Sequence, residues 1–187
     1  MTSPTNTSDD LTGTWTIDPV HSRLGFAVRH AVVTTVRGGF DSFEGTLNLN
    51  GAEPLASSAT VTISTTSINT GNADRDGHLR SGDFLDVAQY PSITFVSSTA
   101  KSGGSDSSFI LSGDITIHGV TKPIDIEIEF GGSAKDPFGN TRAGFEGSTT
   151  INRKDFGITF NAPLETGGLL LSDKVKIELD ISAIKSA

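Results

Sequence analysis

The chain has 187 residues, with 14 lysines and arginines against 22 aspartates and glutamates, and its net charge is −8 at pH 7. This length fits one domain with a sizeable core, and the acidic balance disfavours nucleic acids and anionic membrane surfaces as partners. Cysteine is absent, which excludes disulfides, thiolate metal sites and thiol nucleophiles.

The first twelve residues are polar and are predicted to form a disordered N-terminal tail, while residues 13–187 are predicted to form one domain. The tail lacks the basic and apolar regions of a signal peptide. No part of the chain reaches the roughly 18–20 apolar residues that a membrane-spanning helix needs. We therefore expect a cytoplasmic protein with no integral membrane segment.

After the tail, apolar and polar residues alternate with a period of two. The clearest run extends from Ile124 to Phe130 and reads Ile, Asp, Ile, Glu, Ile, Glu, Phe. One dry face and one wet face are typical of antiparallel strands with one side on a core. The alternating runs cover residues 24–30, 43–49, 60–64, 93–95, 109–118, 124–130 and 175–181.

Turn signals separate these runs and indicate short polar connections. Roughly eight strands joined in this way favour either a β-barrel or a β-sandwich. The single tryptophan and the absence of cysteine argue against the pattern of an immunoglobulin-like sandwich. The turn signals are Asn50-Gly51, Gly103-Gly104, Gly131-Gly132, residues 136–140 and Gly167-Gly168.

Residues 74–86 interrupt the β pattern and contain few β-branched side chains. They are predicted to form a short helical insertion, capped by Asn72 or Asp74. Gly77 weakens the helix, and Tyr90-Pro91 ends the insertion before an extended strand resumes.

Catalytic and metal-binding motifs are missing from the sequence. GxSxG and HExxH do not occur, and residues 72–83 only superficially follow a calcium loop, with Asp83 in place of the usual glutamate. The sequence therefore predicts no catalytic residue, no metal and no cofactor. The histidines, which show no metal-ligand spacing, are His21, His30, His78 and His118.

His30 continues the inward face that Phe26 and Val28 begin. A lone inward histidine is more often a satisfied core residue than a ligand contact. Close to Arg29 and Arg37, however, it could help to hold an anionic head group.

The predicted interior is rich in phenylalanine, with 11 Phe against one Tyr and one Trp. An apolar interior with few polar groups is typical of a small-molecule pocket at the mouth of a barrel. It is equally typical of an ordinary packed core, and the pattern alone does not separate these two interpretations.

Four stretches, in order and spanning nearly the whole chain after the tail, resemble the YceI-like family of polyisoprenoid-binding proteins. The first runs from Trp15 to His30 and contains Asp18-Pro-Val-His21. The second runs from Asp76-Gly-His78-Leu79 to Phe95. The third ends with His118-Gly119-Val120-Thr121. The fourth contains Ile151-Asn-Arg153-Lys-Asp155-Phe156-Gly157.

The resemblance implies an all-β fold, namely an eight-stranded antiparallel lipocalin-like barrel with an apolar tunnel. It implies a bound isoprenoid chain, such as the tail of a quinone or of a polyprenyl phosphate, and no established catalytic residue. Leu85 departs from the phenylalanine that many relatives carry there. The residues expected to line the tunnel are Phe26, Val28, His30, Phe43, Leu79, Phe84, Ile93, Phe95, Ile115, Ile117, Ile126, Ile128 and Phe130.

The sequence thus predicts a binding protein that carries, stores or senses an isoprenoid lipid, with Leu79 and Phe84 closing one end of the tunnel. Two alternatives remain open. One is a lipid-modifying enzyme that uses the same cavity, and the other is a stress-related interaction module with a filled core. A homodimer is expected only from the general frequency of such pairs.

Overall fold

The structure, a computed structural model, describes residues 11–165 and 169–186. Residues 1–10 of the predicted tail and the Gly167-Gly168 turn therefore lie outside the described residues. The elements are β1 (Gly13–Ile17), β2 (Arg23–His30), β3 (Thr34–Phe40), β4 (Phe43–Leu49), β5 (Ser58–Ser64), β6 (Ile68–Asn69), α1 (Ala73–Arg80), β7 (Ser92–Ser102), β8 (Ser108–Ile117), β9 (Val120–Lys135), β10 (Thr141–Asn152) and β11 (Leu171–Lys185), with short 3₁₀ turns at Pro54–Ala56, Thr65–Ser67 and Arg153–Phe156.

Eight antiparallel strands close into a barrel, which confirms the predicted fold. The order around the ring is β1-β4-β5-β7-β8-β9-β10-β11, and β1 pairs with β11 to complete it. The closing pairs include Trp15 with Lys185 and Ile17 with Ala183. Closure leaves no unpaired edge in the ring.

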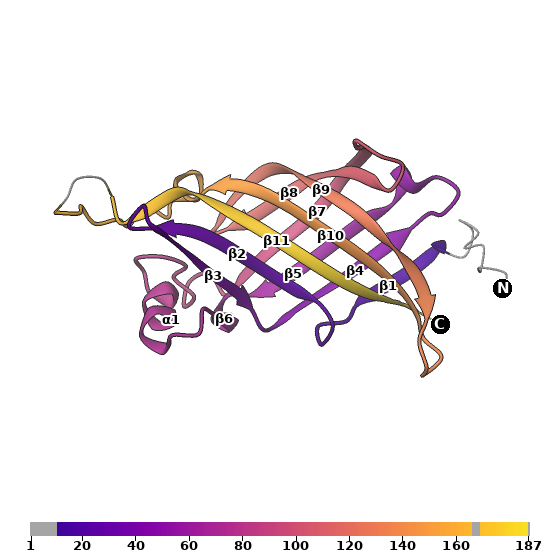
Figure 1. The fold of residues 1–187 in the computed structure, drawn as a ribbon, viewed down its shortest axis with the longest axis horizontal. Coiled ribbons are helices and arrows are strands. Elements are labelled where there is room, and N and C mark those ends of the chain that lie inside the picture. The colour runs from indigo at the N-terminus through magenta and orange to yellow at the C-terminus, as the bar shows by residue number, and fades with distance from the viewer. Residues whose placement is uncertain (1–10, 166–168, 187) are drawn as a thin grey trace.

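The strand β11 is long enough to serve two partners in succession. Its last residues pair with β1, whereas the segment from Leu171 to Asp180 pairs with β2. The strands β3 and β6 then follow β2 outside the ring. Figure 1 shows β3, β6 and α1 at one end of the barrel, away from β1.

The alternation of the sequence is borne out along the barrel wall. Ile115, Ile117, Ile126 and Ile128 are buried. The residues that alternate with the last two, Asp125, Glu127 and Glu129, are exposed. Near the termini, Trp15 has no exposed surface, and its indole Nε1 donates to the carbonyl of Leu11 over 2.8 Å. The barrel therefore has an apolar interior and a polar outer surface.

One predicted turn is wrong. Gly131-Gly132 lies inside the continuous strand β9, where Phe130 pairs with Phe145 and Gly132 pairs with Gly144. Gly131 is the extra residue of a β-bulge, and Gly132 has a φ of 113°. Such a bulge bends a long strand around a barrel, and glycine suits it for the same conformational reason that it suits a turn.

The predicted helical insertion is present as α1. The Asn72 side chain caps it by accepting a hydrogen bond from the backbone N–H of Arg75 over 2.9 Å. The helix ends at Arg80, six residues before the predicted limit, because Ser81 has extended backbone angles and residues 81–89 form successive turns.

Candidate functional site: an apolar cavity inside the barrel

A cavity of about 300 Å³ occupies the end of the barrel next to α1. Inward side chains of β2, β3, β5, β7, β8 and β11 form its wall, and α1 with the segment after it covers it. Its size lies at the lower end of the range for small-molecule pockets. The lining residues include Leu24, Phe26, Val28, Val36, Ile63, Ile93, Ile115, Ile117, Val175 and Ile177.

A second apolar cavity of about 100 Å³ continues the first along the barrel axis. On β11, Val175 and Ile177 line the first cavity, and the next inward residues, Leu179 and Ile181, line the second. Leu24 lines both cavities. The two apolar cavities therefore follow one another inside the barrel, with Leu24 between them.

The cover over the first cavity is an aromatic cluster around His78. The ring centroids of His78 and Phe84 are 4.9 Å apart, those of His78 and Phe160 are 5.0 Å apart, and those of Phe84 and Phe160 are 5.1 Å apart. The His78 Nε2 atom also lies 2.8 Å from a carboxylate oxygen of Asp83. Leu79, the next residue of α1, lines the cavity beside them.

The segment that carries α1 is tied to the barrel by arginine side chains. Arg80 donates from Nε to the carbonyl of Thr66 and from Nη2 to the carbonyl of Ile68. Arg75 donates to the hydroxyl and the carbonyl of Thr70. These bonds hold a short helix over the cavity that its own propensity would not stabilise.

The one deeply buried cation of the described cavity wall is Arg153, of which 5% is exposed. Its guanidinium donates to the backbone carbonyls of Ser172, Ile158 and Phe160 over 3.0, 2.9 and 2.7 Å. Burial lowers the pKa of Arg153, and the carboxylate of Asp173 partly offsets this effect. The group nevertheless keeps its charge, as arginine does in proteins.

In the structure, the residues predicted to line the tunnel fall into three groups. Eight of them line the first cavity: Phe26, Val28, His30, Leu79, Phe84, Ile93, Ile115 and Ile117. Three line the second cavity: Phe95, Ile126 and Ile128. The remaining two line neither, since Phe43 packs in the core and Phe130 borders a separate hollow near the termini, with its ring centroid 5.4 Å from that of Phe145.

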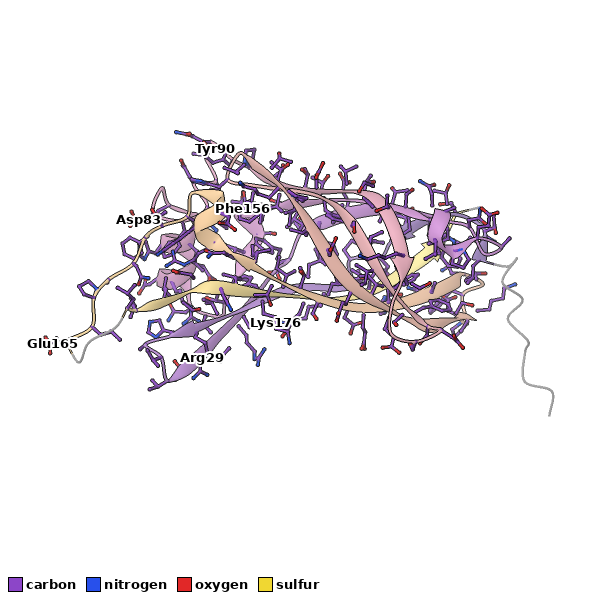
Figure 2. All side chains as sticks on the ribbon, turned by 90° about the horizontal axis from the view of Figure 1, so that it is seen from above. Arg29, Asp83, Tyr90, Phe156, Glu165 and Lys176 are labelled. Atoms are coloured by element: carbon purple, nitrogen blue, oxygen red, sulfur yellow. The ribbon has the colours of Figure 1, made fainter. Side chains whose placement is uncertain are left out.

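The two arginines considered as partners of His30 do not line the cavity. Arg29 donates to the Thr35 hydroxyl and the Val32 carbonyl in the β2–β3 connection. Arg37 pairs with Glu178 on the outer surface, over 3.4 Å. Figure 2 shows Arg29 projecting from the barrel, at the same end as Phe156 and Asp83.

Sequence reasoning missed several lining residues, among them Arg153 and the aromatic residues Phe40, Phe156 and Phe160. Phe40 shares the inward face of Val36, but β3 shows no clear apolar alternation in the sequence, and Phe156 and Phe160 lie outside the long strands. Arg153 and Phe156 both stand in the fourth family-like stretch, which is the sequence signal that could have pointed to Arg153.

The described residues contain no cluster of three or more His, Asp or Glu side chains that could hold a metal ion. The residues of the weak calcium motif have other partners: Asn72 caps α1, Asp76 accepts from the backbone N–H of Thr70, and Asp83 contacts His78. Among the residues that the structure describes, no helix is long and apolar enough to cross a membrane.

Known proteins resemble this chain in sequence and in fold. A UPF0312 protein of Pseudomonas savastanoi pv. phaseolicola is 44% identical over 143 residues, which cover 76% of this chain and 74% of that protein. Among solved structures, Burkholderia cenocepacia BcnA superposes with a TM-score of 0.78 at 21% identity, over 89% of this chain and 98% of that one.

A polyisoprenoid binding domain from Saccharophagus degradans, implicated in plant cell wall breakdown, superposes with a TM-score of 0.69 at 18% identity, over 92% of this chain and 98% of that one. At such low identity these two structures show a shared fold. The family assignment comes from the sequence itself: the YceI-like domain matches residues 15–183, and this chain therefore belongs to the YceI-like domain family.

Proposed function

We propose that this protein binds a long isoprenoid lipid inside the barrel and acts as its carrier, store or sensor rather than as an enzyme. The observation that carries the proposal is the pair of apolar cavities that follow one another along the barrel axis. An elongated space of this kind suits an extended prenyl chain better than a compact ligand. The polyisoprenoid binding domain with the same fold supports the proposal.

Burial of the chain would drive binding, at about 25 cal/mol for each Å² of apolar surface removed from water. The entropy lost when a flexible prenyl chain is immobilised opposes this gain, so the buried area does not convert directly into affinity. The cavity wall contributes side chains from many strands that are already packed in the core, so little of the protein has to be ordered on binding.

The direct test is mass spectrometry of an organic extract of the purified protein. We expect a stoichiometric prenyl species, which would also name the ligand. An empty extract, followed by failure of added prenyl lipids to bind, would contradict the proposal and favour the filled-core module. Chemical conversion of the bound lipid on incubation would favour the lipid-modifying enzyme instead.

A cavity-filling variant provides a second test. Val28→Trp places a large ring in the first cavity, where it would take the place of part of the lipid. We expect prenyl-lipid binding to weaken about 10-fold or more, which corresponds to the loss of roughly 1.4 kcal/mol of binding free energy. Val96→Trp is the matched control, since Val96 is 54% exposed on the outside of β7. Both variants are measured by lipid titration, with circular dichroism to check folding. Equal affinity of the two variants would contradict the assigned cavity.

A further inference from the structure

An exposed apolar turn joins β2 and β3 at the end of the barrel where α1 lies (Figure 1). His30 pairs with Thr34, so the connection consists of Ala31, Val32 and Val33. Val32 is 64% exposed and Val33 is 75% exposed. Single exposed apolar residues are common on protein surfaces, but here two β-branched side chains stand next to each other at the tip of a hairpin.

The backbone of this turn does not suit the residues that it carries. Ala31 has a φ of 52° and Val32 has a φ of 66°, in the left-handed region that glycine and asparagine tolerate best. Among the described residues, Val32 is the one β-branched residue with a positive φ. Valine here is unfavourable for the turn and also for solubility. Such an outlier indicates that the side chain serves a contact outside the turn.

The turn is continuous with the wall of the first cavity. Along β2, Val28 and His30 line the cavity, and the chain then enters the turn. The backbone N–H of Ala31 donates to the carbonyl of Leu170 over 2.7 Å, and Leu170 also lines the cavity. Leu169, the residue before it, is 49% exposed. Apolar side chains therefore extend from the inside of the barrel to its outer surface at this end.

The hairpin that carries the turn is positively charged, although the net charge of the chain is −8. Residues 23–40 include three arginines and no Asp or Glu. Two of these arginines contact Glu178 of β11. The third, Arg29, is exposed at the base of the turn and donates to the Val32 carbonyl over 2.7 Å. An apolar tip with a cation at its base is complementary to a bilayer surface, where phosphates surround the apolar interior.

We propose that the turn of Ala31, Val32 and Val33 inserts into the surface of a lipid bilayer, with Arg29 at the level of the lipid phosphates. The first cavity then lies next to the membrane from which its ligand enters. This inference rests on the proposed function, because a prenyl chain avoids water and is held in a membrane before a protein binds it. The acidic balance of the whole chain opposes strongly anionic membranes, so the surface is one of zwitterionic lipids.

The test uses the double variant Val32→Asn with Val33→Thr. Asparagine tolerates the positive φ and threonine keeps the shape of valine, so we expect a melting temperature no lower than that of the unaltered protein. The measurements are co-sedimentation with phosphatidylcholine vesicles and the initial rate at which a prenyl alcohol passes from these vesicles to the protein. Both should fall about 10-fold or more, because surface binding scales with the apolar area inserted.

Phe138→Ser is the matched control. Phe138 is 88% exposed in the β9–β10 turn, and the residues that follow it pair with the last residues of β11, at the opposite end of the barrel. We expect this variant to behave like the unaltered protein in both measurements. Equal values for all three proteins, or an equal loss in Phe138→Ser, would overturn the inference. A dimer that only the double variant loses, with unchanged lipid transfer, would assign the turn to a second copy of the chain and overturn it as well.

A measurement without vesicles separates this inference from the proposed function. Prenyl alcohol added from ethanol should bind the unaltered protein and the double variant with equal affinity, since Val32 and Val33 line neither cavity. Weaker binding by the double variant would make the turn part of the lipid site and contradict a docking role. Failure of the unaltered protein to bind the alcohol would instead overturn the proposed function.

Discussion

Arg142 joins two carboxylates at the end of the barrel near the termini. Its Nη1 donates to Asp18 over 2.8 Å, and its Nε donates to Asp136 over 2.7 Å. Asp18 follows β1 and also contacts Nδ1 of His21, whereas Asp136 lies in the β9–β10 turn. One side chain thus ties two segments that are far apart in the sequence.

This arrangement predicts a specific dependence of stability on pH. The hydrogen bonds from Arg142 lower the pKa of Asp18 and of Asp136 from 3.8 to about 2 in the folded state. The unfolded chain therefore binds more protons between these values, and stability must fall as the pH drops from about 4 to about 2. We expect denaturant unfolding midpoints to fall more steeply over this range in the unaltered protein than in Arg142→Met.

The difference between the two proteins isolates this pair, since all other carboxylates are common to both. At neutral pH the variant should be the less stable one, because both carboxylates lose their charged partner. Parallel pH profiles for the two proteins would show that Arg142 does not set the pKa of these groups.

For single residues, the alternation of apolar and polar positions was enough to predict apolar wall residues such as Ile115 and Ile117. A period of two fixes which face of the strand a side chain occupies. The alternation does not predict how far along the barrel axis a side chain lies. Phe43 and Phe130 show this limit, since neither lines the two cavities. Arg153 could not be predicted from the pattern, because carbonyls brought together only by folding compensate its burial.

Among the elements, those with strong apolar alternation were predictable, whereas β10 was not. Its inward positions include Ala143, Gly147 and Thr149, which hide the pattern. Gly147 has to be small: a Cβ there would come within 2.7 Å of Ile128 Cδ1 and 3.2 Å of Leu179 Cδ1. A well-filled wall can therefore look like a loop in the sequence.

The element most open to change is α1, which has eight residues with Gly77 among them. Loss of its cap in Asn72→Ala should destabilise the helix by about 1 kcal/mol. We expect faster hydrogen exchange at residues 73–80 and faster transfer of bound lipid to vesicles, with little change in the melting temperature of the barrel.

Asn72→Asp is the control for this prediction, because aspartate also serves as an N-cap. It should behave like the unaltered protein in both measurements. If the alanine variant released lipid at the same rate despite faster exchange in the helix, then α1 would not be the element that retains the ligand.

For the whole molecule, the two cavities in line suggest that the barrel selects prenyl chains by length. Leu24 lines both cavities, whereas Ile181 lines only the second. A bulky residue at Leu24 should therefore obstruct the chain earlier than a bulky residue at Ile181. If the prenyl chain lies inside the ring as proposed, substitutions on the outer surface should leave this selection unchanged.

Leu24→Phe and Ile181→Phe test this with a series of prenyl alcohols of increasing length. In the unaltered protein, affinity should rise with each added isoprene unit until both cavities are filled, since each buried CH₂ contributes up to about 0.8 kcal/mol. The rise should stop at a shorter chain in Leu24→Phe than in Ile181→Phe. Overpacking costs about 1–3 kcal/mol, so the folded state of each variant is checked first by thermal unfolding. The same length dependence in all three proteins, or an earlier stop in Ile181→Phe, would contradict a prenyl chain that fills the first cavity before it passes Leu24 into the second.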